Sequence, residues 1–203
     1  MGLLYEAAKA WKDLNNKKYI FVAAHKGKKY EIELAFNDED FPHLVGMHYA
    51  ADVDFGLNKA EYYGDRLVNA IMNKILDSEK IEQSRNWDNI SGRLTSIINL
   101  QNTLDNDFRI FRFNKNKVRV HSDIKAKYVI KNLITEEIYF VFLDESENRF
   151  YCKSTFKKNN IDYSENQTRL TILQKTKIVD NIPLLLYRKE SYTDTIESQT
   201  EKS

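Results

Sequence analysis

Residues 138–156, IYFVFLDESENRFYCKSTF, have the pattern of two strands joined by a short polar turn. The first run is apolar at every position, which is typical of a strand buried on both faces. The second run alternates apolar side chains with Lys, Ser and Thr, as expected for a strand with one solvated face. So short a connection favours antiparallel pairing, and a sheet therefore organises this part of the chain.

Further segments with the same β-rich texture flank this hairpin. They are residues 108–114, 118–121, 127–134 and 168–179, and a polar loop, 157–167, precedes the last of them. The short turns between the others favour antiparallel neighbours. We therefore expect an antiparallel sheet of four or more strands in the second half of the chain.

The first half has the pattern of helices and one hairpin. Apolar residues recur at spacings of three and four in residues 2–15, and residues 17–36 show two strands around a turn at 26–28. Polar capping residues open further helices over residues 59–77 and from Asp88 onward. The sequence thus predicts a single α+β domain over residues 1–189, followed by a disordered acidic tail over 190–203.

The composition is that of a protein that folds unaided. Hydrophobic residues make up 42% of the chain and aromatic residues 12%, which excludes a disordered or repetitive protein. The start of the chain has no secretory pattern, and its longest aliphatic cluster is too short to cross a bilayer, so we expect a cytoplasmic protein with no membrane partner. The one cysteine, Cys152, excludes an internal disulfide and is interpreted as a small core residue.

The charges are divided unevenly along the chain. Residues 109–189 hold 17 Lys and Arg against 9 Asp and Glu, whereas the chain as a whole has a net charge of only +1. Such asymmetry indicates an anionic partner, although lysines covering a solvated face would give the same count.

The stretch NDEDFPHLVGMHY, residues 37–49, places His43 in the first turn of a short helix. A helix N-terminus lowers the pKa of a histidine, and the preceding acids raise it, so the direction of the shift stays open. His43 is a candidate general base, and the alternative is that it only caps or packs the turn. His48 lies about 140° further around a continuous helix, so we expect it on a different face, in the core or at its rim.

The strand at residues 149–156 carries a second group of candidates. Alternation with period two places Tyr151, Lys153 and Thr155 on one face, where they could meet a phosphate. Lys127 and Lys175 on neighbouring strands would extend this basic surface as substrate-binding residues. The alternative for each is an ordinary exposed sheet position.

Other chemistries have little support in the sequence. None of the four histidines has the spacing of a metal-binding motif, and there is no Walker loop, no GxGxxG and no GxSxG. We therefore expect no metal and no cofactor.

The stretch FPHLVGMHY after the hairpin, the helical middle, and strands carrying FYCKSTF and LQKTKIV together resemble a known family over residues 18–180. This is the phage-associated branch of the barnase/EndoU/colicin/RelE-like nucleases, in its fourth subgroup. The resemblance implies a hydrolase of toxin ancestry, with helices packed against a four-stranded antiparallel sheet whose open face holds RNA. It also implies metal-independent chemistry, with His43 as the helical histidine and Lys153 and Thr155 as the polar residues of the third sheet strand.

The leading functional hypothesis is a toxin or phage-effector endoribonuclease, encoded by a phage or prophage, that cleaves RNA by transesterification. Its catalytic residues would be His43, Lys153 and Thr155. An antitoxin or immunity protein would be a fitting partner. The alternative is a catalytically inactive binding protein of phage or mobile-element origin, either an RNA-binding module or an inhibitor of a host defence protein. The sequence leaves the oligomeric state open.

Overall fold

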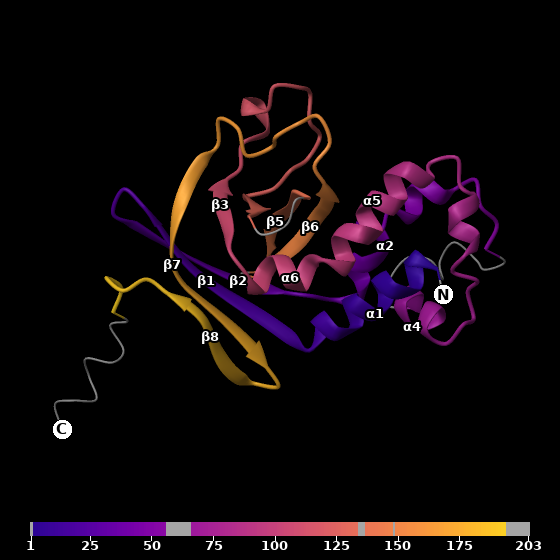
Figure 1. The fold of residues 1–203 in the computed structure, drawn as a ribbon, viewed down its shortest axis with the longest axis horizontal. Helices are drawn as coiled ribbons and strands as arrows, with labels where there is room; N and C mark the ends of the chain where they lie inside the picture. Colours follow the sequence, from indigo (N-terminus) through magenta and orange to yellow (C-terminus); the bar gives the residue numbers. More distant parts are fainter. Residues whose placement is uncertain (1, 56–65, 134–136, 148, 194–203) are drawn as a thin grey trace.

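The computed structural model describes residues 2–55, 66–133, 137–147 and 149–193. In these residues eight strands form one sheet, in the order β1-β2-β6-β5-β4-β3-β7-β8, and β1 pairs with β7 as well as with β2. Seven strands thereby close into a barrel, and β8 lies outside it (Figure 1). The strands are β1 (Lys17–His25), β2 (Lys28–Ala35), β3 (Phe108–Arg112), β4 (Tyr128–Asn132), β5 (Tyr139–Ser146), β6 (Arg149–Lys157), β7 (Thr168–Val179) and β8 (Ile182–Arg188).

The helices gather on one side of the barrel (Figure 1). The first, α1, packs against α4 and α5, and α5 also packs against β6. Between β2 and α4, the short helix α2 contacts β6, and the turn η2 contacts α5. The helices are α1 (Leu3–Asn15), α2 (Phe41–Leu44), α4 (Arg66–Met72), α5 (Trp87–Ile98) and α6 (Leu100–Asp105), with 3-10 turns η1 (Asp38–Asp40), η2 (Met47–Ala50), η3 (Lys80–Gln83) and η4 (Lys115–Lys117).

Closure of the sheet corrects the expectation of helices and a hairpin followed by a separate open sheet. The α+β class is confirmed, but the N-terminal hairpin belongs to the same sheet as the later strands. Strand β1 pairs with β7 from Lys17 opposite Val179 to Ala24 opposite Thr171, and β2 joins β6 in a parallel pairing. Closure satisfies backbone groups that an open edge would leave unpaired.

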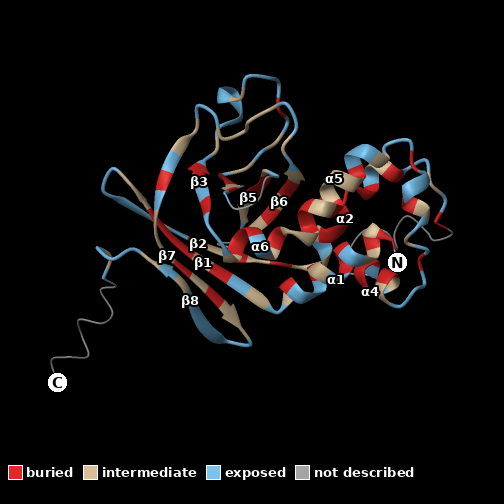
Figure 2. Cartoon of the chain, in the orientation of Figure 1, coloured by how far each residue is buried: buried red, intermediate tan, exposed pale blue. Residues whose placement is uncertain are grey.

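Two hydrophobic clusters hold the fold together. The larger fills the barrel and continues between the helices, and the smaller lies on the outer face of β3, β4 and β5. Residues of the two long connections after β3 and after β6 cover this outer cluster. Strand β5 contributes to both clusters, so its prediction as a central strand that is apolar on both faces is confirmed, whereas β8 is largely exposed (Figure 2).

Several predicted boundaries differ from the structure. Helix α4 ends at Met72 rather than 77, because Lys74 has a φ of 57° and ends the helix in a left-handed conformation. Residues 118–121 form no strand, since the chain leaves β3 through η4 and finds no ladder partner there. The sequence analysis did not predict strand β8.

Parts of several predictions fall on residues that the structure does not describe. These are residues 59–65 of the predicted helix, residue 134 of the predicted strand, residue 148 of the predicted turn and residues 194–203 of the predicted tail. Among the described helices, none is long and apolar enough to cross a membrane.

Candidate active site

A glycine between α2 and η2 brings two histidines together. Gly46 has a φ of 79°, and a Cβ there would lie 2.9 Å from Cδ2 of Tyr49 and 3.1 Å from Cδ of Arg93. Only glycine adopts this conformation freely in so little space. The helix therefore stops, and the rings of His43 and His48 stack with centroids 5.4 Å apart and planes 16° apart. The prediction that His48 lies on a different face is wrong, because it assumed a continuous helix.

Arg93 on α5 lies beside this histidine pair. Its guanidinium carbon is 5.2 Å from the ring centre of Tyr49, and the ring of His48 packs on the same tyrosine at 4.0 Å. One terminal nitrogen of Arg93, Nη1, is buried and has no hydrogen-bond partner among the described residues. A buried donor without a partner is uncommon, and the positive charge of Arg93 acts on both histidines.

A β-bulge in β6 places Lys153 at the same location. Phe142 pairs with Ser154 and Leu143 with Cys152, so Lys153 has no residue opposite it on β5. Its Nζ donates a hydrogen bond of 3.4 Å to Oη of Tyr151. The extra residue re-aims Lys153 toward the histidine pair.

The same bulge separates Thr155 from Tyr151 and Lys153. Thr155 is fully buried, and its Oγ1 donates a hydrogen bond to the carbonyl of Phe140 at 3.1 Å. The prediction that the three residues share one face is therefore wrong, because an inserted residue shifts the alternation of the strand. Thr155 is not on the surface that holds His43.

A cavity of about 450 Å³ is lined by His43 and Lys153, whereas His48 and Arg93 are not among its lining residues. Asp40 and His43 lie on one side of it, contributed by the chain after β2, and β6 supplies the basic and phenolic groups on the other side. The cavity is lined by Asn37, Glu39, Asp40, His43, Ser146, Glu147, Arg149, Tyr151, Cys152 and Lys153.

The pKa of His43 is lowered from its ordinary value of 6.5. Partial desolvation is the main cause, and the positive charges of His48, Lys153 and Arg93 act in the same direction. The pKa of His48 is lowered as well, by desolvation and by Arg93. His43 is therefore neutral at pH 7 and able to accept a proton, which gives the direction that the sequence left open.

Asp40 is shifted in the opposite sense. Burial, followed by the charge of Glu39, raises its pKa to about 6, although Arg149 and Lys153 oppose the shift. Its Oδ2 is buried without a hydrogen-bond partner among the described residues. The cavity thus holds a histidine that loses its proton easily and a carboxyl group that retains its proton up to about pH 6, two shifts in opposite directions.

Two of the predicted basic residues lie elsewhere. Lys175 is only 3% exposed, and its Nζ donates hydrogen bonds to the carbonyls of Asp105, at 3.4 Å, and of Asn106 at the end of α6. Its predicted place on a basic surface is wrong, because the end of a helix supplies acceptors that bind it in the interior. Lys127 is exposed, pairs with Glu145 and lines a separate hollow.

The sequence analysis missed Asp40, Arg93 and Arg149 and placed His48 wrongly. The only local signal was the glycine between two histidines in HLVGMHY. Cys152 is buried in the core as predicted, with a pKa raised by burial. Among the described residues, no group of three or more His, Cys, Asp and Glu side chains could hold a metal ion.

Comparison with protein families gives a match over residues 3–191, nearly the whole chain. The matching family is described as phage-Barnase-EndoU-ColicinE5/D-RelE like nuclease 4. The chain belongs to this family. The resemblance drawn from the sequence is thereby confirmed, and membership implies a phage-associated nuclease with a nucleic-acid substrate. Comparison with curated proteins and with solved structures gave no match.

Proposed function

We propose that this nuclease is an endoribonuclease of toxin or phage-effector type, and that it cleaves RNA by metal-independent transesterification in the cavity around His43. The observation that carries the proposal is the pair of oppositely shifted groups, His43 and Asp40, beside Lys153 in one cavity. Such opposed shifts in one cleft mark a site of acid and base catalysis.

The residues supply each group that the reaction needs. Neutral His43 accepts the proton of the ribose 2′-hydroxyl, whose oxygen forms a bond to phosphorus while the bond to the 5′-oxygen breaks. Protonated Asp40 donates its proton to that leaving oxygen. The products are a 2′,3′-cyclic phosphate and a free 5′-hydroxyl.

Cationic groups stabilise the charge that develops on the phosphorus oxygens. Lys153 acts from the bulge of β6, where it lines the cavity, and Arg93 adds its positive charge from α5 beside His43 and His48. Tyr151, held by its hydrogen bond with Lys153, offers a ring on which a base can stack. His48 stacks on the ring of His43 and, after desolvation, contributes to the lowered pKa of His43.

The test is incubation of the purified protein with total RNA in the presence of a chelator, followed by analysis of the fragment ends. We expect fragments that end in 2′,3′-cyclic phosphate, and we expect no cleavage of single-stranded DNA, which lacks the 2′-hydroxyl. Fragments that appear only with a divalent cation, or that carry 3′-hydroxyl ends, would contradict the proposal. Intact RNA under all conditions would favour the alternative of an inactive binding protein.

A further inference from the structure

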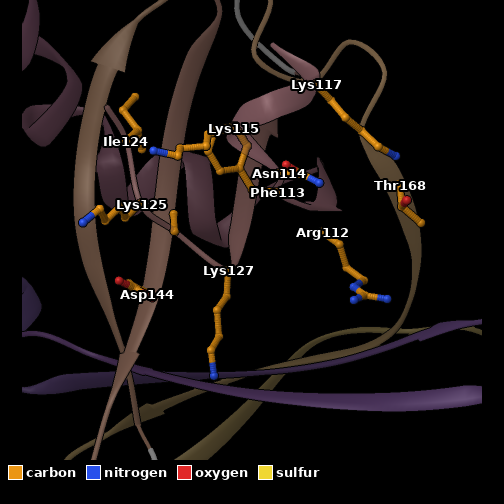
Figure 3. A pocket seen from close by; sticks show the side chains of 11 residues that line it. Arg112, Phe113, Asn114, Lys115, Lys117, Ile124, Lys125, Lys127, Asp144 and Thr168 are labelled. Atoms are coloured by element: carbon orange, nitrogen blue, oxygen red, sulfur yellow. The ribbon is translucent and has the colours of Figure 1, made fainter. Parts of the chain in front are cut away.

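A second hollow, with a volume of about 540 Å³, lies at the end of the barrel where β3 and β5 end and β4 and β7 begin. Five cationic side chains and one acidic side chain, Asp144, line it. Figure 3 shows the cationic side chains spread around the hollow and pointing in different directions, and most of them come from the connection between β3 and β4. The five cations, here called the basic mouth, are Arg112, Lys115, Lys117, Lys125 and Lys127.

We propose that the basic mouth binds the phosphate backbone of single-stranded RNA on one side of the cleavage site. The inference deepens the proposed function and rests on it, because it names where the substrate runs beyond the His43 cavity. Clusters of Lys and Arg along a groove are the electrostatic footprint of nucleic-acid binding.

The charges of the basic mouth are largely available to a ligand. Within the described ranges, Lys127 is the member with an ion-pair partner, Glu145, and Arg112 lies 5.9 Å from the ring centre of Tyr30. Lys115, Lys117 and Lys125 are exposed to solvent. Since like charges gathered at one opening repel one another, an anion placed there relieves the repulsion.

The loop that carries these lysines is held in place. The backbone N–H of Asn114 donates to Oε1 of Gln167 at 2.8 Å, and Nε2 of Gln167 donates back to the carbonyl of Asn114 at 3.1 Å. Arg119 pairs with Glu165 at 2.5 Å, and Phe113 packs edge-on against Phe142 with ring centres 5.1 Å apart. A surface ordered before binding loses less entropy when the ligand arrives.

The basic mouth lies next to the His43 cavity. Asp144 lines the mouth and Tyr151 lines the cavity, and the two residues are direct cross-strand partners on β5 and β6. Side chains of such a pair lie about 5 Å apart, so one pair of residues separates the two hollows. A strand of RNA that has a phosphate at His43 can therefore continue into the mouth, which favours RNA over an acidic protein as the occupant.

The test measures RNA affinity in a His43→Ala background, which removes cleavage from the measurement. The test variant adds Lys115→Gln, Lys117→Gln and Lys125→Gln, and the matched control adds Lys9→Gln, Lys74→Gln and Lys189→Gln at exposed positions on other segments. Fluorescence anisotropy with a labelled 12-nucleotide single-stranded RNA gives Kd at several salt concentrations. Thermal midpoints of both variants verify that they fold.

We expect the test variant to raise Kd at least tenfold at low salt and the control to raise it less than twofold. The slope of log K against log salt should shrink by about 2 in the test variant, since each lost phosphate contact on a single strand removes about 0.7. Equal losses in both variants, or an unchanged Kd in the test variant, would overturn the proposal. Cleavage is not read out here, so an inactive wild type would contradict the proposed function without deciding this result.

Discussion

Lys153 in the His43 cavity and Lys175 at the junction of α6 and β7 are both lysines on strands of one barrel. They differ in burial and in the hydrogen bonds that they make. Lys175 is 3% exposed and binds carbonyls at the end of α6, and burial lowers its pKa to about 8. Lys153 lies at a bulge of β6, and among the described residues its Nζ donates a hydrogen bond to the phenol oxygen of Tyr151 and lies 5.6 Å from the centre of that ring. A cation whose donors already bind acceptors of the protein stabilises the fold, whereas one with spare donors beside titratable groups is suited to a site.

The largest effect is expected in the cavity that holds Lys153, at Asp40. Asp40→Asn should lower RNA cleavage at pH 6 by about 10²- to 10⁴-fold, because a general acid is lost. In the wild type, cleavage needs neutral His43, with a pKa below 6.5, and protonated Asp40, with a pKa of about 6, so the rate should peak near pH 6. The fall in rate above pH 6 should disappear in the variant. A rate that keeps rising above pH 7 in the wild type would remove Asp40 from the mechanism.

The next effect concerns Lys153 itself. Lys153→Met should lower kcat by about 10²-fold, since it removes a group that stabilises charge in the transition state. The thermal midpoint should change little, because the side chain is partly exposed. Single-turnover cleavage of a defined RNA gives the rate, and Lys157→Met on the same strand is the control. Equal rates for the two variants would place Lys153 outside the site.

A smaller effect, on stability alone, is expected at Lys175. Lys175→Met should lower the free energy of unfolding by about 2 kcal/mol, because two helix-terminal carbonyls lose a charged donor. Cleavage well below the thermal midpoint should be unchanged. Denaturant unfolding, with Lys74→Met as the exposed control, measures the difference.

The pH dependence at Lys175 has a definite sign. Because its pKa is lower in the folded state than the ordinary 10.5, the unfolded chain binds more protons between about pH 8 and pH 10.5. The free energy of unfolding of the wild type should therefore rise as the pH increases through this range. Lys175→Met should lack this rise. A variant that retained the same pH dependence would show that Lys175 is not the titrating group.

The smallest effect is expected at Thr155. Thr155→Val should cost about 1 kcal/mol of stability by deleting a buried hydrogen bond to the Phe140 carbonyl. Its rate of RNA cleavage should match that of the wild type. Loss of cleavage in a variant that still folds would restore the catalytic role inferred from the family resemblance.

The elements of the fold could be predicted from the sequence where they depend on local periodicity. The amphipathic helix at Leu3–Asn15 and the hairpin of β1 and β2 were found in this way. Closure of the barrel could not be, because it depends on pairing between Lys17 and Val179, which are remote in the chain. Strand β8 lacks the alternation of a half-buried strand, since most of its side chains are exposed on both faces.

The candidate site was only partly predictable for a related reason. His43 and Lys153 carry local signals, a helix start and a basic position on a polar strand. The approach of His48 depends on the left-handed turn at Gly46, and the separation of Lys153 from Thr155 depends on a bulge that the alternation in FYCKSTF conceals. Arg93 arrives on a different helix, so no spacing in the sequence links it to the histidines.

The most direct test of the central claim compares His43→Ala with His121→Ala in cleavage of RNA in the presence of a chelator. His121 is a matched control, because its side chain is 86% exposed and, among the described residues, it pairs with the neighbouring Asp123. We expect His43→Ala to lose at least 10²-fold in rate and His121→Ala to cleave like the wild type, with both proteins equally stable. Wild-type cleavage by His43→Ala would show that the chemistry takes place outside the cavity described here.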